Sequence, residues 1–235
     1  MAFDVYVGTF TRYYRREWEN VVQQQAKREG TQYRMVYAGG EPEPPPPADD
    51  IRAGINAWRD AINQALGENI TNPLSWDESD DRPYFTDRPA WPGYNALLLW
   101  ASYADHPQMT RPQKLPEEWF DDPAFLATTE AERLGPFGNI VRSNLWIPGD
   151  FKFNFGFVAP TNEKATIGST SGFLESMNAL NEATFKATSE DLHRWRMGED
   201  SDSDDLESVA RFGFAVFHAL ALKAVKHQLP ILLSF

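Results

Sequence analysis

Cysteine is absent from this chain of 235 residues. Without a thiol the chain cannot form a disulfide, hold zinc or an iron–sulfur cluster through thiolates, or attack a substrate with a cysteine nucleophile. A chain without disulfides fits a reducing compartment. Any chemistry that this chain performs therefore falls to oxygen, nitrogen and aromatic side chains.

Positive charge is also scarce, because 22 lysines and arginines stand against 34 aspartates and glutamates and give a formal net charge of −12. A field of this sign repels nucleic-acid phosphates and anionic membranes. We therefore expect no nucleic-acid partner, no membrane partner and, instead, a basic protein as the partner. An acidic surface that serves solubility alone is the alternative.

Targeting and membrane-spanning signals are missing as well. The first residues, Met1 to Val5, contain no basic stretch followed by an apolar run, so we expect no secretion signal. The most apolar segment, 212–225, is interrupted by His218 and Lys223 and is shorter than the roughly 18 residues that cross a bilayer. These features predict a soluble, cytoplasmic protein.

The sequence has no recognisable metal-binding pattern. Its four histidines do not have the spacing of a metal site, and no HExxH motif is present. The acidic run Asp200 to Asp205 resembles a calcium loop, but Asp205 stands where glycine is required and Arg211 where glutamate is required. We therefore expect neither a metal nor another cofactor. The histidines are His106, His193, His218 and His227.

The most informative feature that is present is the alternation of phenylalanines in 151–157. Side chains on a strand point to opposite faces with a period of two, so these four rings form one aromatic face. A turn at 159–163 and a return strand at 164–168 complete a hairpin. The pattern predicts an α+β fold, with a mixed or antiparallel sheet that includes a Phe-rich hairpin at about 151–168. We expect the rings to face a helix layer that contains the 212–222 helix.

The remaining pattern predicts one domain, 1–235, with an exposed Pro-rich spacer at 41–47. Thr11 begins a helix that Gly30 ends, and Asp49 or Asp50 begins another that Gly67 ends. Asp122 followed by proline begins a short helix. The other expected elements are strands at 3–10, 32–38 and 140–147, helices at 94–104 and about 171–185, a short helix at 189–196, a long helix from about 205 to 227, and an apolar tail at 231–235.

The segment 71–93 is a long loop rich in proline, acidic and aromatic residues. Long loops inside a compact domain are uncommon and often functional. Aromatic anchors surrounded by charge are typical of protein-binding surfaces, and acidic charge speeds association with a basic partner. We therefore predict a partner-binding site in this loop. Its residues are Trp76, Asp77, Glu78, Asp80, Asp81, Tyr84, Phe85 and Trp91.

A second, alternative site is the turn of Gly168, Ser169, Thr170 and Ser171, which lies between a predicted strand and a predicted helix. Glycines allow close approach of the backbone, and a helix N-terminus attracts an anion. The turn lacks the lysine of a phosphate-binding loop. A strand-to-helix turn capped by serine therefore explains the same residues and is favoured.

Two functions fit these observations. The first is a cytoplasmic protein-binding module of the immunity or antitoxin type, which neutralises a cognate toxin by stoichiometric binding and needs no catalytic residue. The second is a hydrolase whose carboxylates and histidine come from distant parts of the chain, since a Ser–His–Asp set can assemble across a fold. The two hypotheses are distinguished by what co-purifies with the chain or is encoded beside it in the native host: a toxin-like neighbour supports the first, and a metabolic operon favours the second.

Overall fold

The computed structural model describes residues 3–31, 44–199 and 204–234. Its centre is a six-stranded mixed sheet of order β2-β1-β6-β3-β5-β4, which confirms the α+β fold. Strands β3 and β5 are parallel, and the other pairs are antiparallel. The strands are β1 (Asp4–Val7), β2 (Phe85–Asp87), β3 (Leu145–Ile147), β4 (Phe155–Val158), β5 (Lys164–Ser169) and β6 (Ile231–Ser234).

Both faces of the sheet are covered, so the central strands are buried on both sides. On β1, Val5 and Val7 point into one core, here called the first core, while Tyr6 points into the other, the second core. On β3, Trp146 likewise points into the first core, whereas Leu145 and Ile147 point into the second core. Two covered faces explain why β1 has no exposed position, unlike a strand with one solvated face.

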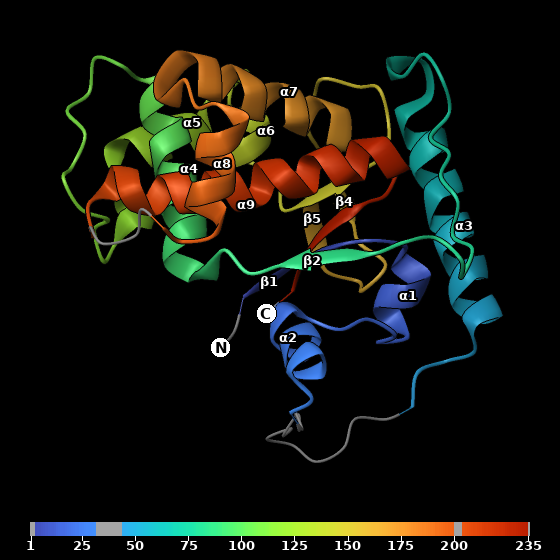
Figure 1. Ribbon diagram of the computed structural model, residues 1–235. Helices are drawn as coiled ribbons and strands as arrows, with labels where there is room; N and C mark the ends of the chain where they lie inside the picture. The colour runs from blue at the N-terminus through green and yellow to red at the C-terminus, as the bar shows by residue number, and fades with distance from the viewer. Residues whose placement is uncertain (1–2, 32–43, 200–203, 235) are drawn as a thin grey trace.

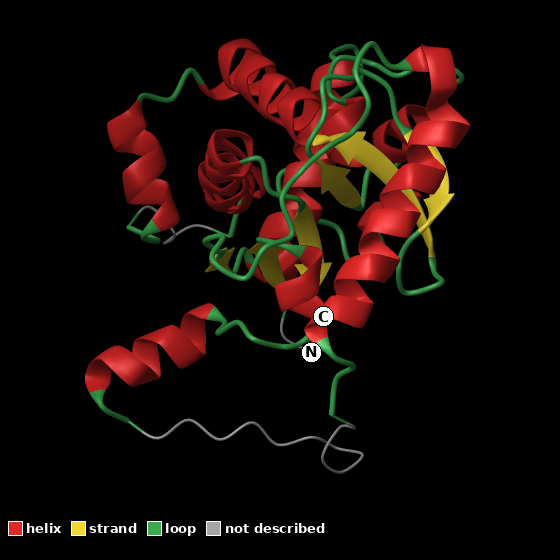
Figure 2. Cartoon of the chain, turned by 90° about the vertical axis from the view of Figure 1, so that its right-hand side faces the viewer, coloured by secondary structure: helices red, strands yellow, loops and turns green. Residues whose placement is uncertain are grey.

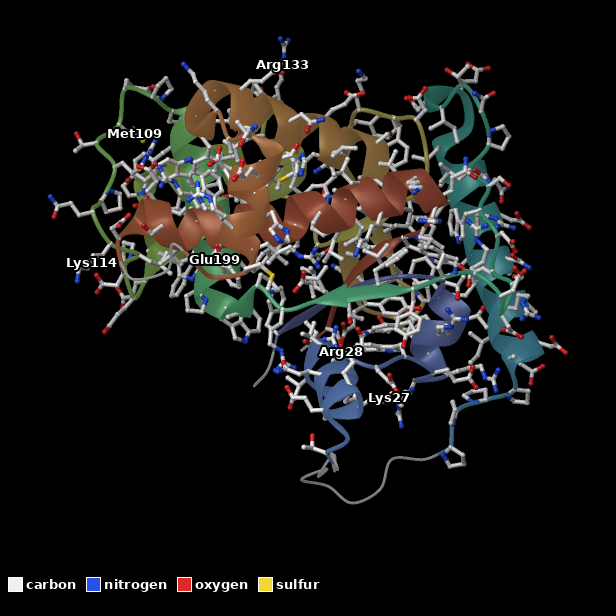
Figure 3. All side chains as sticks on the ribbon, viewed as in Figure 1. Lys27, Arg28, Met109, Lys114, Arg133 and Glu199 are labelled. Carbon is white, nitrogen blue, oxygen red and sulfur yellow. The ribbon has the colours of Figure 1, made fainter. Side chains whose placement is uncertain are left out.

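The first core lies under a large layer of helices, with α9 running through its middle (Figure 1). Helices α4 and α9 approach closely, and a Cβ on Gly213 would lie 2.1 Å from the carbonyl oxygen of Gly93. Charged side chains such as Lys114 and Arg133 point outward (Figure 3). The helices of this layer are α4 (Ala90–Asp105), α5 (Pro123–Glu130), α6 (Gly138–Val141), α7 (Thr170–Leu180), α8 (Ser189–Arg196) and α9 (Leu206–His227).

Within the described residues, α9 alone is long and apolar enough to cross a membrane by length and composition. It packs instead between α4, α7 and α8, and Phe214 and Phe217 are almost completely buried there. The helix extends beyond the apolar segment 212–225 at both ends, so it is longer than the segment from which the sequence-based expectation was drawn.

The second core lies on the opposite face, beneath α1 and α3 (Figure 1). Helix α3 buries Ile55, Ile62 and Leu66 on one face, as its apolar period predicted, and Gly67 ends it. Its N-cap is Pro47, and Asp49 and Asp50 lie in the first turn. The helices outside the large layer are α1 (Phe10–Tyr14), α2 (Val21–Glu29) and α3 (Ala48–Leu66).

The phenylalanine face forms, but it packs on the other layer from the one expected. Phe151 is buried, while Phe153, Phe155 and Phe157 are half-buried, and all four belong to the second core, with α3 and not with α9. Regular strand begins only at Phe155. A period of two identifies a shared face but cannot decide which layer covers it when both faces are covered.

Three further expectations were wrong in detail. The helix predicted from Thr11 to Gly30 is interrupted, because Arg16 has a φ of 58° and Asn20 caps a separate helix, α2. The segment 140–147 begins with a helical turn, α6, before β3. The apolar tail is β6, which pairs with β1 and β3 inside the sheet.

Helix starts and stops agree better with the sequence. Asp122 caps α5 with proline at the first helical position, Asp205 caps α9, and Gly30 ends α2 in a left-handed conformation. The strand predicted at 32–38 and the first three residues of the spacer, 41–43, lie outside the described residues, whereas 44–47 are exposed and have no regular secondary structure.

Candidate functional site

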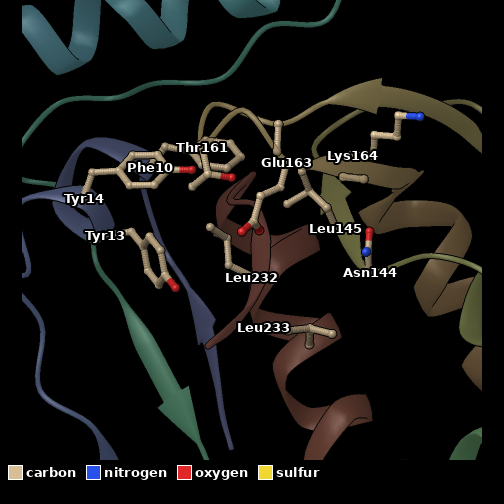
Figure 4. A pocket seen from close by; sticks show the side chains of 12 residues that line it. Phe10, Tyr13, Tyr14, Asn144, Leu145, Thr161, Glu163, Lys164, Leu232 and Leu233 are labelled. Carbon is tan, nitrogen blue, oxygen red and sulfur yellow. The ribbon is translucent and has the colours of Figure 1, made fainter. Parts of the chain in front are cut away.

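A cleft opens where the β4–β5 turn leaves the sheet and faces α1 and α3 (Figure 4). It consists of two adjoining cavities of about 290 Å³ and about 590 Å³. The two share Tyr14, Ala159 and Thr161 as lining residues, so they form one concave surface, here called the cleft.

The smaller cavity combines aromatic walls with one carboxylate. Tyr13 and Tyr14 come from α1, and Leu145 and Leu232 come from β3 and β6. The Glu163 side chain reaches over the cavity from the turn, and the Lys164 side chain points away from it (Figure 4). The carboxylate is therefore the charged group presented to whatever enters the cavity.

The two tyrosines are neutral hydrogen-bonding groups at physiological pH. Burial raises the pKa of Tyr13 and of Tyr14, and the nearby Glu163 carboxylate raises both further because it repels a phenolate. The Tyr13 hydroxyl is also hydrogen-bonded to the side chain of Ser234. These phenols can donate hydrogen bonds and offer ring faces, but they are poor bases.

Glu163 is held in place by a tight turn and not by an ion pair. The Ala159 N–H donates to the Glu163 carbonyl at 2.8 Å, and Asn162 adopts a left-handed φ of 63° between them. Among residues 3–31, 44–199 and 204–234, no side chain forms an ion pair or a hydrogen bond with the Glu163 carboxylate. A carboxylate in this state is available to a cation from outside.

The larger cavity is mainly apolar. Ile51, Ile55 and Trp58 of α3 form one wall, and Phe157 and Val158 of β4 form the other. The Trp58 indole N–H donates to the Val158 carbonyl at 2.7 Å and so ties α3 to β4. This hydrogen bond fixes the width of the cleft at that point.

Two residues of the predicted partner-binding loop lie inside the protein, behind the cleft. Glu78 is 4% exposed and accepts four hydrogen bonds, from the N–H groups of Phe10 and Thr11, the Thr11 hydroxyl and the Trp76 indole. Trp76 in turn packs its ring against Trp58 and Phe10. As surface contacts for a partner these two assignments were wrong, because both side chains are buried. They hold the start of α1, and hence the tyrosines, in position.

The other predicted residues of this loop do not converge. Asp80 pairs with Arg52 at 3.0 Å, while Asp77 and Asp81 both accept hydrogen bonds from Ser79. The bonds from Ser79 lower the pKa of Asp77. Tyr84 packs in the second core beside the ring of Tyr6, whereas Phe85 lies in β2 against the first core and the Trp91 ring packs at a tilt against Phe3. Their role in partner binding remains a prediction.

The alternative anion site is occupied by the protein's own groups. Ser169, and not Ser171, caps α7 by accepting from the Gly172 N–H, and its hydroxyl donates to the Phe151 carbonyl. The Ser171 hydroxyl donates to the Gly149 carbonyl. Ser169 and Thr170 are buried, and Gly168 lies against the side chain of Asn139. These contacts support the capping interpretation.

The histidines lie elsewhere in the fold. His218 is hydrogen-bonded to Asn178 at 2.9 Å, and burial lowers its pKa. In the part of the chain that the structure describes, no group of histidine, cysteine, aspartate and glutamate could hold a metal ion.

Sequence reasoning missed Tyr13, Tyr14 and Glu163 as a set. The turn at 159–163 was predicted correctly, and Tyr14 was assigned to an apolar helical stripe. Nothing in the sequence indicates that α1, the β4–β5 turn and β6 meet around one cavity. The short helix that leaves both tyrosine rings half-buried beside the cavity appears only in the structure.

Comparison with models of known protein families, with curated proteins and with solved structures finds no match to this chain.

Proposed function

We propose that this chain is a cytoplasmic binding protein of the immunity or antitoxin type, which neutralises a basic toxin protein by stoichiometric binding. The observation that carries the proposal is the Glu163 carboxylate, which reaches over an aromatic cleft without an ion-pair partner in the described residues. A lysine or arginine side chain of the partner fits this chemistry.

The energetic argument has two parts. A cation over the ring of Tyr13 or Tyr14 gains about 0.5–1 kcal/mol at an exposed site, and a charge-assisted hydrogen bond to Glu163 adds to it. The net charge of −12 attracts a basic protein from a distance and raises the association rate. The first part determines where the partner binds, and the second determines how fast it arrives.

Growth rescue tests the proposal. The chain is co-expressed with the product of the gene beside its own in the native host, at graded molar ratios. We expect growth to recover only when the chain reaches equimolar amounts, and native mass spectrometry to detect a one-to-one complex. Rescue at substoichiometric amounts, with the toxin chemically altered afterwards, would show that the chain is an enzyme.

Two variants of equal charge locate the binding site. Glu163→Gln should weaken the complex about tenfold, which corresponds to about 1.4 kcal/mol. Glu130→Gln removes the same charge from the exposed end of α5, far along the chain from the cleft, and should change the affinity by less than about twofold. Equal effects of the two variants would mean that only the overall charge matters.

A further inference from the structure

Strand β4 is an edge of the sheet, and within residues 3–31, 44–199 and 204–234 no other strand pairs with its outer side. The opposite edge, β2, is three residues long, and its Asp87 pairs with Arg196 at 2.6 Å. Charged residues and short length protect an edge from pairing with another chain. Strand β4 has four residues, Phe155–Val158, and no charged side chain, so it lacks the charge protection of β2.

The hydrogen-bonding groups of Gly156 and Val158 point away from β5. In an antiparallel pair, residues that exchange hydrogen bonds alternate with residues that do not. Ala159 and Glu163 are joined across the turn, so Phe157 and Phe155 are the next residues bonded to β5. The bond from the Trp58 indole to the outward Val158 carbonyl agrees with this assignment. The N–H and C=O of Gly156 and the N–H of Val158 are therefore directed outward.

Space is present on both faces of this edge. The apolar cavity of the cleft lies on the α3 side, beside Ile51 and Trp58. A second cavity of about 580 Å³ lies along the hairpin and is lined by Gly156, Lys164 and Thr166. Both cavities include Phe157 and Val158 among their lining residues. Val158 is 47% exposed, and a Cβ on Gly156 would meet nothing within 4 Å.

We propose that β4 binds an extended segment of the partner protein as an added strand. The outward N–H and C=O of Gly156 and the outward N–H of Val158 supply the main-chain hydrogen bonds, while the Val158 carbonyl keeps its bond to the Trp58 indole. The side chains of the segment alternate between the two cavities. The segment is apolar at every second position, where it faces Ile51 and Trp58, and small and polar between, where it faces Lys164 and Thr166. The hairpin stands at the end of the sheet beside α3 (Figure 2). This inference rests on the proposed function in one respect, namely that the ligand is a protein.

A short synthetic peptide tests strand addition. It alternates threonine and valine between terminal lysines, which keep it soluble, and a second peptide is methylated on the nitrogens of alternate residues. We expect saturable binding of the first peptide by calorimetry, with slower hydrogen exchange at the amides of Gly156 and Val158. The methylated peptide should bind about tenfold more weakly or worse, because it cannot donate to the edge.

A pair of variants complements the peptides. Gly156→Pro removes the outward N–H and should weaken peptide binding about tenfold, whereas Gly156→Ala keeps it and should bind within about twofold of the natural chain. Circular dichroism confirms that both variants are folded. No binding of the unmethylated peptide, or equal binding of the two peptides, would overturn the proposal. If strand addition fails while Glu163→Gln still weakens the toxin complex, the proposed function stands without it.

Discussion

The Glu78 carboxylate joins the 71–84 segment to the start of α1, so its replacement should destabilise the whole second core. Four donors converge on its two oxygens: the Thr11 N–H at 2.8 Å, the Thr11 hydroxyl at 2.9 Å, the Trp76 indole at 2.7 Å and the Phe10 N–H at 3.3 Å. With Glu78 only 4% exposed, water cannot replace the lost acceptor without rearrangement.

Glutamine at this position keeps the shape and one acceptor oxygen but places an NH₂ group against donors. A hydrogen bond to a charged group contributes about 1.5–3 kcal/mol, and a buried donor left unsatisfied costs about 1–3 kcal/mol. We therefore expect Glu78→Gln to lower the free energy of unfolding by about 3 kcal/mol and Glu78→Ala by about 4–5 kcal/mol. The larger effect follows because alanine leaves all four donors unpaired.

Urea unfolding followed by circular dichroism and tryptophan fluorescence measures these changes. Glu163→Gln is the matched control, because this glutamate is exposed and should lose less than about 0.5 kcal/mol. A loss below about 1 kcal/mol for Glu78→Gln would refute the reasoning, since it would mean that the four hydrogen bonds add little to stability.

Three further predictions follow from single contacts. Gly213→Ala should lower the free energy of unfolding in urea by about 2–4 kcal/mol, because the new Cβ would lie 2.1 Å from the Gly93 carbonyl oxygen. Gly54→Ala in α3 is the control: its Cβ would meet nothing within 4 Å, so the change should be neutral or stabilising by up to about 1 kcal/mol. Phe151→Ala should cost about 3–5 kcal/mol, because the ring is 3% exposed; a loss under about 1 kcal/mol would contradict its place in the second core. Burial lowers the pKa of His218, so as the pH falls the unfolded chain binds a proton at this histidine before the folded chain does. The free energy of unfolding should therefore decrease as the pH drops below about 6.5. His218→Gln should flatten this pH dependence, and an unchanged slope in the variant would contradict the prediction.

The sequence predicted the elements whose signals are local. Gly30 and Gly67 end their helices, and Asp122 followed by proline begins one, because caps depend on neighbouring backbone groups. The hairpin turn was also predicted, since turn residues act over a few positions. Arg16 was missed, because a left-handed arginine carries no sequence signal.

The candidate site depends on long-range packing, which the sequence does not display. Trp76 and Glu78 are residue types that are common on binding surfaces. The sequence alone cannot distinguish a buried glutamate that accepts four hydrogen bonds from an exposed glutamate. The cleft joins residues such as Tyr13 and Glu163, which lie far apart in the chain and meet only once β6 pairs beside β1. The layer that covers the phenylalanines of 151–157 likewise depends on the position of α3, which the sequence does not show.

Hydrogen exchange with the basic protein that co-purifies with the chain from its native host tests the central claim most directly. The chain is measured alone and in the complex, at a salt concentration low enough to keep the long-range attraction, whose screening length is about 8 Å at physiological ionic strength. The cleft predicts slower exchange at 10–14 and 157–164, which carry Tyr13, Tyr14 and Glu163. Unchanged exchange in both segments, with protection elsewhere, would contradict the cleft as the site of binding.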